Sequence, residues 1–332
     1  MFRWLASRRW LALGASCACL ALLAQDTPTI KVNVNLVRVV ASVKNRQGEL
    51  VGTLRKEDFE LYDNNVRQDI AVFERRTEQP LSVALIVDAS GSTAKEMQYE
   101  TKSATGFLRA LLAEGNTEDA VALYCFNYDV TLMQNFTHNY AALERQFKLL
   151  HGEGGSSVYD SIFFASRALE PREGRKVIVL VTDGGDTTSS RDSHQALKDA
   201  QLADAVIYPV VVMPITNDAG RNVGGENALT WIAQGTGGRT FLQTSTAAQL
   251  DKAFADIISE LRTQYLLGFY PHGVPLTKNP FHSLEVRPRS QELRVSARNG
   301  YYGESEGNGG SSGDRISVTP DRKAPPPKKK TP

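Results

Sequence analysis

A continuous apolar segment of the chain ends in three oxygen-bearing side chains whose spacing suits a metal ion. Residues 81–87 are all apolar except for one serine, and Asp88, Ser90 and Ser92 follow them around Gly91. Carboxylate and hydroxyl oxygens are the hard ligands that Mg²⁺ prefers. In a turn that glycine opens, an aspartate with hydroxyls two and four residues later can direct three oxygens into one concavity. The spacing therefore predicts part of a divalent-cation site.

Two later segments carry the same kinds of ligand. A second apolar run, residues 177–181, is followed by Thr182, Asp183 and Gly184, which places another carboxylate at the end of a predicted strand. Between the two runs, residues 152–157 form a glycine-rich loop with two serine hydroxyls. These segments add oxygen donors that could complete the same site.

The D-x-S-x-S spacing, the later loop hydroxyl and the T-D-G sequence together resemble the von Willebrand factor A domain and its metal-ion-dependent adhesion site. The resemblance implies that the ion is held by Asp88, Ser90, Ser92, Ser156 and Asp183. Ser156 stands where the family more often has threonine, so the hydroxyl is kept and one methyl group is lost. In that family one coordination position accepts a carboxylate from a partner protein. We expect Mg²⁺, while Mn²⁺ and Ca²⁺ stay open.

The flanks of the apolar region extend the resemblance to residues 30–302. Residues 54–65, 264–271 and 297–302 resemble the flanks of exported bacterial proteins, the acidobacterial von Willebrand factor A-related family. The family's strand order, 3-2-1-4-5-6, makes strands 1 and 4 neighbours at the point where the winding reverses, and ligands bind at such a point. The resemblance thus implies that Asp88 and Asp183 lie at one crevice.

Hydrophobic periodicity predicts the elements that would position these residues. Strand and helix patterns alternate from residue 81 to residue 265, which indicates an α/β fold. The segment that connects residues 120–126 to residues 130–136 is so short that the two predicted strands can form only an antiparallel hairpin. The predicted fold is a Rossmann-like, doubly wound, mostly parallel sheet with one antiparallel edge strand. Helices are expected at residues 97–111, 140–150, 159–169 and 250–265, and further strands at residues 176–182 and 205–213.

Alternating apolar residues before and after this region predict a second, all-β part. We expect the two flanks to pair as a small β-sandwich. A shift in the alternation near residue 37 indicates a bulge or two consecutive strands. The predicted organisation is a signal peptide at 1–24, a β region at 30–78, the α/β domain at 79–262, a second β region at 263–302 and a flexible tail at 303–332.

The first 24 residues have the pattern of an export signal. They contain Arg3, Arg8 and Arg9 and no acidic residue, and an apolar run too short to span a bilayer follows. We expect cleavage near Ala24 and a secreted, periplasmic or envelope-associated protein without a transmembrane segment. The segment also resembles a twin-arginine signal, so the export route stays open.

Charge and cysteine content exclude several classes of function. The chain has 38 basic and 37 acidic residues, which gives no general electrostatic case for nucleic-acid binding. Cys125 is the only cysteine after the signal, which excludes a disulfide framework and a thiolate metal site. Three consecutive lysines in the tail, residues 328–330, could contact anionic polymers or lipids of the envelope.

The sequence therefore predicts a non-enzymatic adhesion module that captures an acidic group of a partner protein through a bound cation. One alternative is an architectural envelope protein in which the metal only stabilises the fold. Another is a magnesium-dependent phosphohydrolase, which also places an aspartate after its first strand. Such enzymes use a second carboxylate two residues later as acid or base, and here that residue is Ser90.

Overall fold

The protein is described from a computed structural model of the whole chain. The structure describes residues 36–75, 79–213, 222–242, 246–275 and 277–303. The predicted export signal and nearly all of the predicted tail lie outside these residues. Among the described helices, none combines the length and the apolar character that crossing a bilayer requires.

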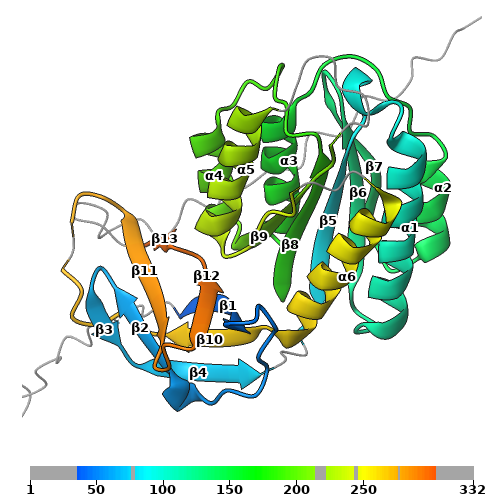
Figure 1. Ribbon diagram of the computed structural model, residues 1–332. Coiled ribbons are helices and arrows are strands. Elements are labelled where there is room, and N and C mark those ends of the chain that lie inside the picture. The colour runs from blue at the N-terminus through cyan, green and yellow to red at the C-terminus, as the bar shows by residue number, and fades with distance from the viewer. Residues whose placement is uncertain (1–35, 76–78, 214–221, 243–245, 276, 304–332) are drawn as a thin grey trace, which may run out of the picture. The chain divides into compact units, whose positions relative to one another are not determined.

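A five-stranded sheet lies at the centre of the α/β part, in the order β7-β6-β5-β8-β9 (Figure 1). Four strands are parallel, and β7 pairs antiparallel with β6 at the edge. The predicted sheet with one antiparallel edge strand is therefore confirmed, and the first and fourth strands of the sheet, β5 and β8, are neighbours. The strands are β5 (Leu81–Asp88), β6 (Ala120–Phe126), β7 (Val130–Thr137), β8 (Arg175–Thr182) and β9 (Ala205–Val211).

Helices cover both faces of this sheet, as Figure 1 shows. Alternate residues of a strand point to opposite faces, and in β5 both sets are apolar and buried. Val83 and Leu85 pack with α1, α2 and α6, whereas Ala84 and Ile86 pack with α3, α4 and α5. The helices are α1 (Met97–Glu114), α2 (Tyr140–Phe147), α3 (Val158–Leu169), α4 (Ser193–Leu202), α5 (Val223–Thr236) and α6 (Ala247–Thr263).

Local capping residues explain where several helices begin and end. Asp192 accepts a hydrogen bond from the backbone of Gln195 at the start of α4, and Gln195 reciprocates, which forms a capping box. Helix α5 ends at Gly237, whose φ of +87° is the left-handed conformation that glycine adopts without a Cβ clash. Gly237 thus marks the end of this helix.

The remaining strands form two four-stranded antiparallel sheets, in the orders β12-β1-β10-β4 and β13-β11-β2-β3. Strand β1 is one continuous strand, with Val37, Val39, Ala41 and Val43 buried on one face. Residues 30–35, where the alternation has the other phase, lie outside the described residues. The strands are β1 (Val37–Asn45), β2 (Phe59–Asp63), β3 (Val66–Gln68), β4 (Ile70–Arg75), β10 (Tyr265–Phe269), β11 (Phe281–Pro288), β12 (Leu293–Ala297) and β13 (Gly300–Tyr302).

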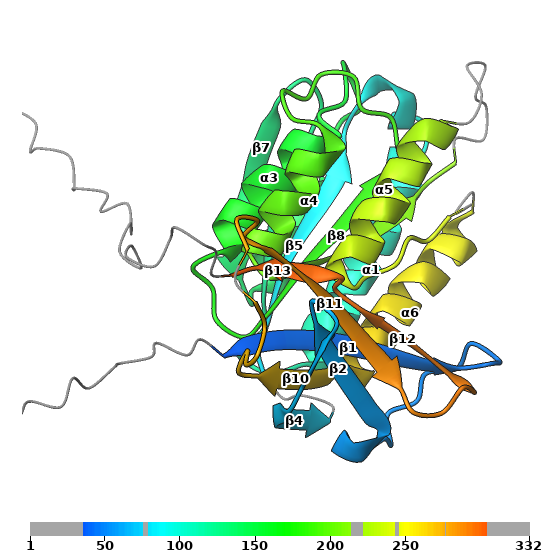
Figure 2. The ribbon, with the colours of Figure 1, turned by 90° about the vertical axis from the view of Figure 1, so that its left-hand side faces the viewer.

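Strands from the two flanks of the chain pair directly with each other. Strand β1 lies between β10 and β12, and β2 pairs with β11; Figure 2 shows β10 beside β1. Phe59, Leu61, Tyr265 and Phe269 form much of the shared core. The described residues from Leu36 onward belong to one compact unit, so the boundaries at residues 79 and 263 stay predictions.

Candidate metal centre

Three loops meet where β5 and β8 end. The two strands pair in parallel register up to Val87 and Val181, so Asp88 and Thr182 leave the sheet side by side. Oδ2 of Asp88 accepts a hydrogen bond from the Thr182 hydroxyl at 2.7 Å. This bond joins the loop after β5 to the loop after β8, at the edge of the sheet where ligands bind in open α/β folds.

The loop after β5 holds its oxygens by short-range hydrogen bonds. Oδ1 of Asp88 accepts from the backbone N–H of Ser90 at 2.9 Å, and the Ser90 and Ser92 hydroxyls lie 3.0 Å apart. The Thr93 hydroxyl donates to the backbone carbonyls of Asp88 and Ser90 and closes the short 3₁₀ turn η2 (Gly91–Thr93). Asp88 and Ser90 are buried, while Ser92 is exposed.

Ser156 brings the second loop to the third. Its hydroxyl donates to the carbonyl of Gly185 at 2.5 Å, and its backbone N–H donates to the Thr187 hydroxyl at 2.9 Å. Its own carbonyl accepts from the backbone N–H of Thr187 at 2.8 Å. Because a hydroxyl that donates one hydrogen bond keeps its lone pairs, the Ser156 oxygen remains able to bind a cation.

Tyr128 supports the same loop from the turn between β6 and β7. Gly154 has a φ of +80°, and a Cβ added there would lie 2.6 Å from the Tyr128 ring. The Ser157 hydroxyl donates to the backbone carbonyl of Tyr128 at 2.7 Å. The ring itself is 64% exposed. The backbone conformation therefore favours glycine at position 154, and a Cβ there would also displace the exposed Tyr128 ring.

The third loop presents Asp183 and turns Asp186 away. Oδ1 of Asp183 accepts from the backbone N–H of Gly185 at 2.9 Å, and the side chain is partly exposed. Oδ1 of Asp186 accepts instead from the Ser189 hydroxyl and from the backbone N–H of Tyr159. Asp186 thus has a structural role within the loop, and Asp183 is the carboxylate left at the edge of the sheet.

The carboxylates at this edge repel one another when they are ionised. Burial raises the pKa of Asp88 to about 7 against the hydrogen bonds from Ser90 and Thr182, and the charge of Asp183 raises it further. Burial also raises the pKa of Glu100 well above its usual range, and repulsion from Asp88 adds to this. Both carboxylate oxygens of Glu100 are buried without a hydrogen-bond partner. A divalent cation would offset this repulsion.

The donors in the three loops fit a hard divalent cation. Within the described ranges, no group of three or more His, Cys, Asp or Glu side chains is arranged to hold a metal. A cation here would therefore depend on two carboxylates together with hydroxyls and water, which is the ligand type of Mg²⁺. The three loops carry every residue of the predicted set, namely Asp88, Ser90, Ser92, Ser156 and Asp183.

The predicted set does not include two residues that the structure places close to the site. Thr182 precedes Asp183 in the T-D-G sequence, and the strand register shows why its hydroxyl meets Asp88. Glu100 lies on α1 in phase with the buried side chains Ser103 and Phe107, at helical spacing. An acidic residue in phase with a buried helix face is the sequence signal that could have revealed it.

Comparison with known proteins identifies the α/β part. Residues 83–185 match the family model of the von Willebrand factor type A domain. No curated protein matches the chain. The matched residues include the strands β5 and β8 and all three loops of the site.

Similar solved structures come from several bacteria. The von Willebrand factor domain of the type V pili tip protein Mfa5 from Porphyromonas gingivalis is 15% identical, with a TM-score of 0.46, over 55% of this chain and 94% of that one. The PilB minor pilin from Streptococcus sanguinis is 16% identical, with a TM-score of 0.44, over 56% and 62%. A von Willebrand factor type A protein from Catenulispora acidiphila is 11% identical, with a TM-score of 0.47, over 82% and 74%. At this level, the similarities assign no function.

Proposed function

The chain contains a von Willebrand factor type A domain, and we propose that this domain captures an acidic group of a partner protein through a bound divalent cation. The proposed ion is Mg²⁺, with Mn²⁺ and Ca²⁺ as alternatives. Its ligands would come from the three loops at the carboxyl ends of β5 and β8. The proposed ligands are Asp88, Ser90, Ser92, Ser156 and Asp183.

The observation that carries this proposal is the burial of Asp88, with no cation among the described groups that shift its pKa. This carboxylate is fully buried, yet it lies at a loop edge beside Asp183, which raises its pKa further. Buried carboxylates are ordinarily paired with a cation or fully hydrogen-bonded. Two hydrogen bonds, from Ser90 and Thr182, hold Asp88 in place without supplying a positive charge. A divalent cation bound here would supply that charge.

The same ligand set supports a site with room for a partner. Mg²⁺ prefers six oxygen ligands and usually keeps several waters. Two carboxylates and three hydroxyls, not all of which need bind directly, leave at least one position for water or for an incoming Asp or Glu. The exposure of Ser92 and the partial exposure of Asp183 give such a group access.

The side chains of the site favour binding over catalysis. Two residues after Asp88, the chain has Ser90, whose hydroxyl is paired with that of Ser92 rather than with a base. Position 90 therefore supplies neither the second carboxylate of a phosphohydrolase nor a serine that a histidine activates. We therefore propose that the protein is not an enzyme. Phosphatase and esterase assays of the purified chain test this directly, and turnover that depends on Asp88 would contradict it.

We further propose that the protein acts outside the cytoplasm. The support is the composition of its first 24 residues, with three arginines followed by an apolar run. Cell fractionation, with N-terminal sequencing of the exported form, tests this. Assignment to the acidobacterial subfamily stays a prediction.

The binding proposal is tested with poly-L-glutamate as the acidic probe. We expect the full chain to bind it in Mg²⁺ and to release it in EDTA, and Asp88→Ala to bind neither Mg²⁺ nor the probe. Asp251→Ala, which changes an exposed aspartate on α6, should bind as the wild type does. If metal removal lowers stability while probe binding persists, the architectural alternative is correct instead.

A further inference from the structure

A recess lies at the end of the central sheet opposite to the candidate metal centre. It has a volume of about 890 Å³ and is lined where β5, β8 and β9 begin, by Ser82, Lys176 and Ala205 among others. Arg38 of β1 and Leu266 of β10 line it from the antiparallel sheet. Small-molecule sites have volumes of about 300–1,000 Å³, so the recess is large enough for a ligand.

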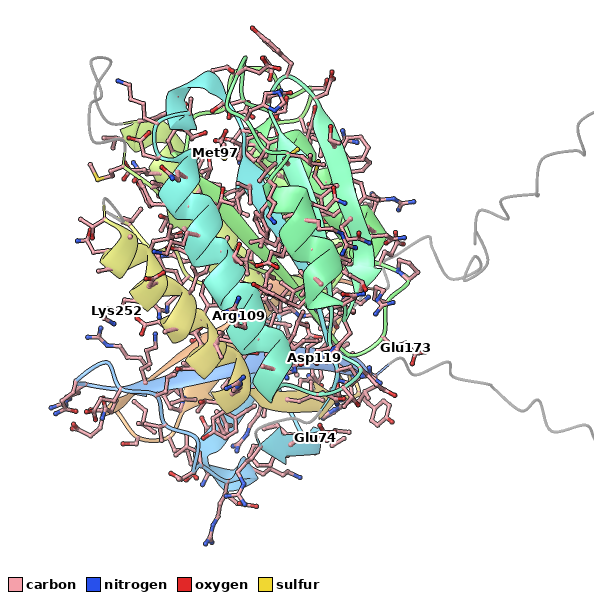
Figure 3. All side chains as sticks on the ribbon, turned by 90° about the vertical axis from the view of Figure 1, so that its right-hand side faces the viewer. Glu74, Met97, Arg109, Asp119, Glu173 and Lys252 are labelled. Atoms are coloured by element: carbon pink, nitrogen blue, oxygen red, sulfur yellow. The ribbon has the colours of Figure 1, made fainter. Side chains whose placement is uncertain are left out.

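The two sites are far apart because they lie at opposite ends of the same strands. Strand β8 has 8 residues, of which Arg175 begins the strand at the recess and Thr182 ends it at the metal centre. At about 3.3 Å per residue, the separation is roughly 20 Å. Figure 3 shows Met97 toward one end of the α/β part and Asp119 and Glu173 toward the other.

The walls of the recess carry more positive than negative side chains. Its carboxylates are Glu118, Glu173 and Asp204. Glu118 and Glu173 are exposed, so that water screens their charge, and Asp204 pairs with a lining arginine. The cationic side chains on the walls are Arg38, Arg172, Arg175, Lys176 and Arg298.

Three of these cations, Arg175, Lys176 and Arg172, donate hydrogen bonds to neutral acceptors. The Arg175 guanidinium donates to the backbone carbonyls of Leu261 and Gln79. The Lys176 ammonium donates to the carbonyl of Glu170 at 2.8 Å. Such bonds fix the donors in place without adding a negative charge. The charge of Asp119 acts on Arg175, and those of Asp204 and Glu170 act on Lys176.

Arg172 also contacts only neutral groups among its described neighbours. Its Nε donates to the Ser82 hydroxyl at 2.9 Å, and its guanidinium lies over the Phe136 ring. Neither neighbour brings a negative charge. Among the described side chains that line the recess, five cations face three carboxylates, although the whole chain is nearly neutral.

One N–H group of Arg298 lacks a hydrogen-bond acceptor among the described residues. Its side chain is 10% exposed, and its terminal nitrogens bind the Asp204 carboxylate and the carbonyl of Arg38. Its Nε is buried with no hydrogen-bond partner. Burial lowers the pKa of Lys176 against the attraction of Asp204 and Glu170, and the nearby Arg38 lowers it a little further. An anion in the recess would favour the charged form of Lys176.

We propose that the recess binds a small polyanion that carries phosphate or carboxylate groups. Guanidinium groups bind such oxyanions through paired N–H donors, and several of them can share one multiply charged ligand. Arg38 and Lys176 are the cations best suited to reach it. Arg38 is exposed and Lys176 is half-buried, and they come from two different sheets that line the recess. This site is independent of the metal centre.

Titration calorimetry of the full chain with inorganic pyrophosphate, and separately with citrate, tests the proposal at constant ionic strength without divalent metal. We expect saturable binding of at least one anion. Arg38→Gln should weaken it about tenfold, which corresponds to about 1.4 kcal/mol, because one charge-assisted hydrogen bond is lost. The double variant Arg38→Gln/Lys176→Gln should show no binding. Circular dichroism melting shows whether the double variant folds. If it does not fold, the anion affinity of Arg38→Gln alone tests the proposal.

Two control variants make the outcome specific. Arg46→Gln removes an exposed arginine whose partner is Glu292, outside the recess, and should bind as the wild type does. Asp88→Ala should also keep the anion affinity, which separates this site from the metal centre. No saturable binding of either anion by the wild type, equal binding by the double variant, or an equal loss in Arg46→Gln would overturn the proposal.

Discussion

The hydroxyl of Thr182 donates to the carboxylate of Asp88 at 2.7 Å and so links the ends of two neighbouring parallel strands. Both residues are buried, at 1% and 0% exposure. The bond fixes one oxygen of Asp88, while the backbone N–H of Ser90 fixes the other. A carboxylate held from both sides cannot turn away from the loops, which is what a metal ligand at this position requires.

Removal of this hydroxyl tests the link. Thr182→Val keeps the shape of the side chain but leaves the Asp88 carboxylate with one hydrogen bond. We expect a loss of about 1–3 kcal/mol in the free energy of unfolding, measured by urea denaturation, and weaker Mg²⁺ binding by calorimetry. Thr182→Ser restores the hydroxyl and should recover most of the metal affinity. Equal Mg²⁺ affinity in Thr182→Val and the wild type would show that the link does not serve the site.

The stability of the metal-free protein should fall as pH rises. The pKa of Asp88 is about 7 in the folded state against 3.8 in the unfolded chain, so the folded state holds this proton more tightly. The stabilisation is complete below pH 3.8 and is lost as pH rises through 7. At about 1.4 kcal/mol per pH unit, the loss is up to about 4 kcal/mol.

Urea denaturation in EDTA at pH 5 and pH 8 measures about 3 kcal/mol of this loss, because pH 5 already lies above 3.8. Asp88→Asn should remove most of the difference between the two conditions. Because protons compete with the cation for Asp88, Mg²⁺ binding should also weaken below pH 7. If Asp88→Asn keeps the full pH dependence of stability, a group other than Asp88 causes it.

Glu100 should destabilise the metal-free protein at alkaline pH. Its carboxylate is buried, its oxygens lack hydrogen-bond partners, and its pKa is raised well above the usual range by burial and by Asp88. Glu100→Gln removes the charge and should increase the free energy of unfolding at pH 8, with little effect at pH 5. Glu144→Gln, at a partly exposed position on α2, serves as the control. A destabilised Glu100→Gln at pH 8 would contradict the prediction.

Gly154 and Gly48 form a matched pair for testing the second loop. Both have positive φ, at +80° and +83°, but a Cβ on Gly154 would meet the Tyr128 ring, while one on Gly48 would meet nothing within 4 Å. Both alanine variants should lose about 1 kcal/mol to backbone strain. Only Gly154→Ala should also lose Mg²⁺ affinity, because the displaced loop carries Ser156. Equal Mg²⁺ affinity in the two variants would show that this loop does not hold the ion.

The central sheet could be predicted from the sequence because its signals are local. Residues 81–87 and 177–181 are almost wholly apolar, and only a hairpin fits the short link between residues 120–126 and 130–136. Helix α4 is not among the predicted elements, because its buried residues are largely alanines such as Ala196 and Ala200, which give a weak apolar stripe. Helix α5 contains several glycines and escaped prediction for a similar reason.

The candidate site could be predicted only in part. Spacing along the chain indicates Asp88, Ser90 and Ser92, which share one loop. The link from Asp88 to Thr182 depends on strand register, which the sequence of either strand alone does not reveal. The phase of Glu100 with the buried face of α1 indicates burial, but the sequence does not show that this residue lies close to Asp88.

Titration with Mn²⁺, followed by water-proton relaxation, tests whether the ends of β5 and β8 hold a cation, because it reports both binding of the ion and the water that stays on it. The full chain should bind one Mn²⁺ with a strong relaxation enhancement, Mg²⁺ should compete, and poly-L-glutamate should reduce the enhancement by displacing water. Asp88→Ala should abolish the signal and Asp251→Ala should keep it. An absent signal in the wild type, or an undiminished one in Asp88→Ala, would contradict a cation site at the ends of β5 and β8.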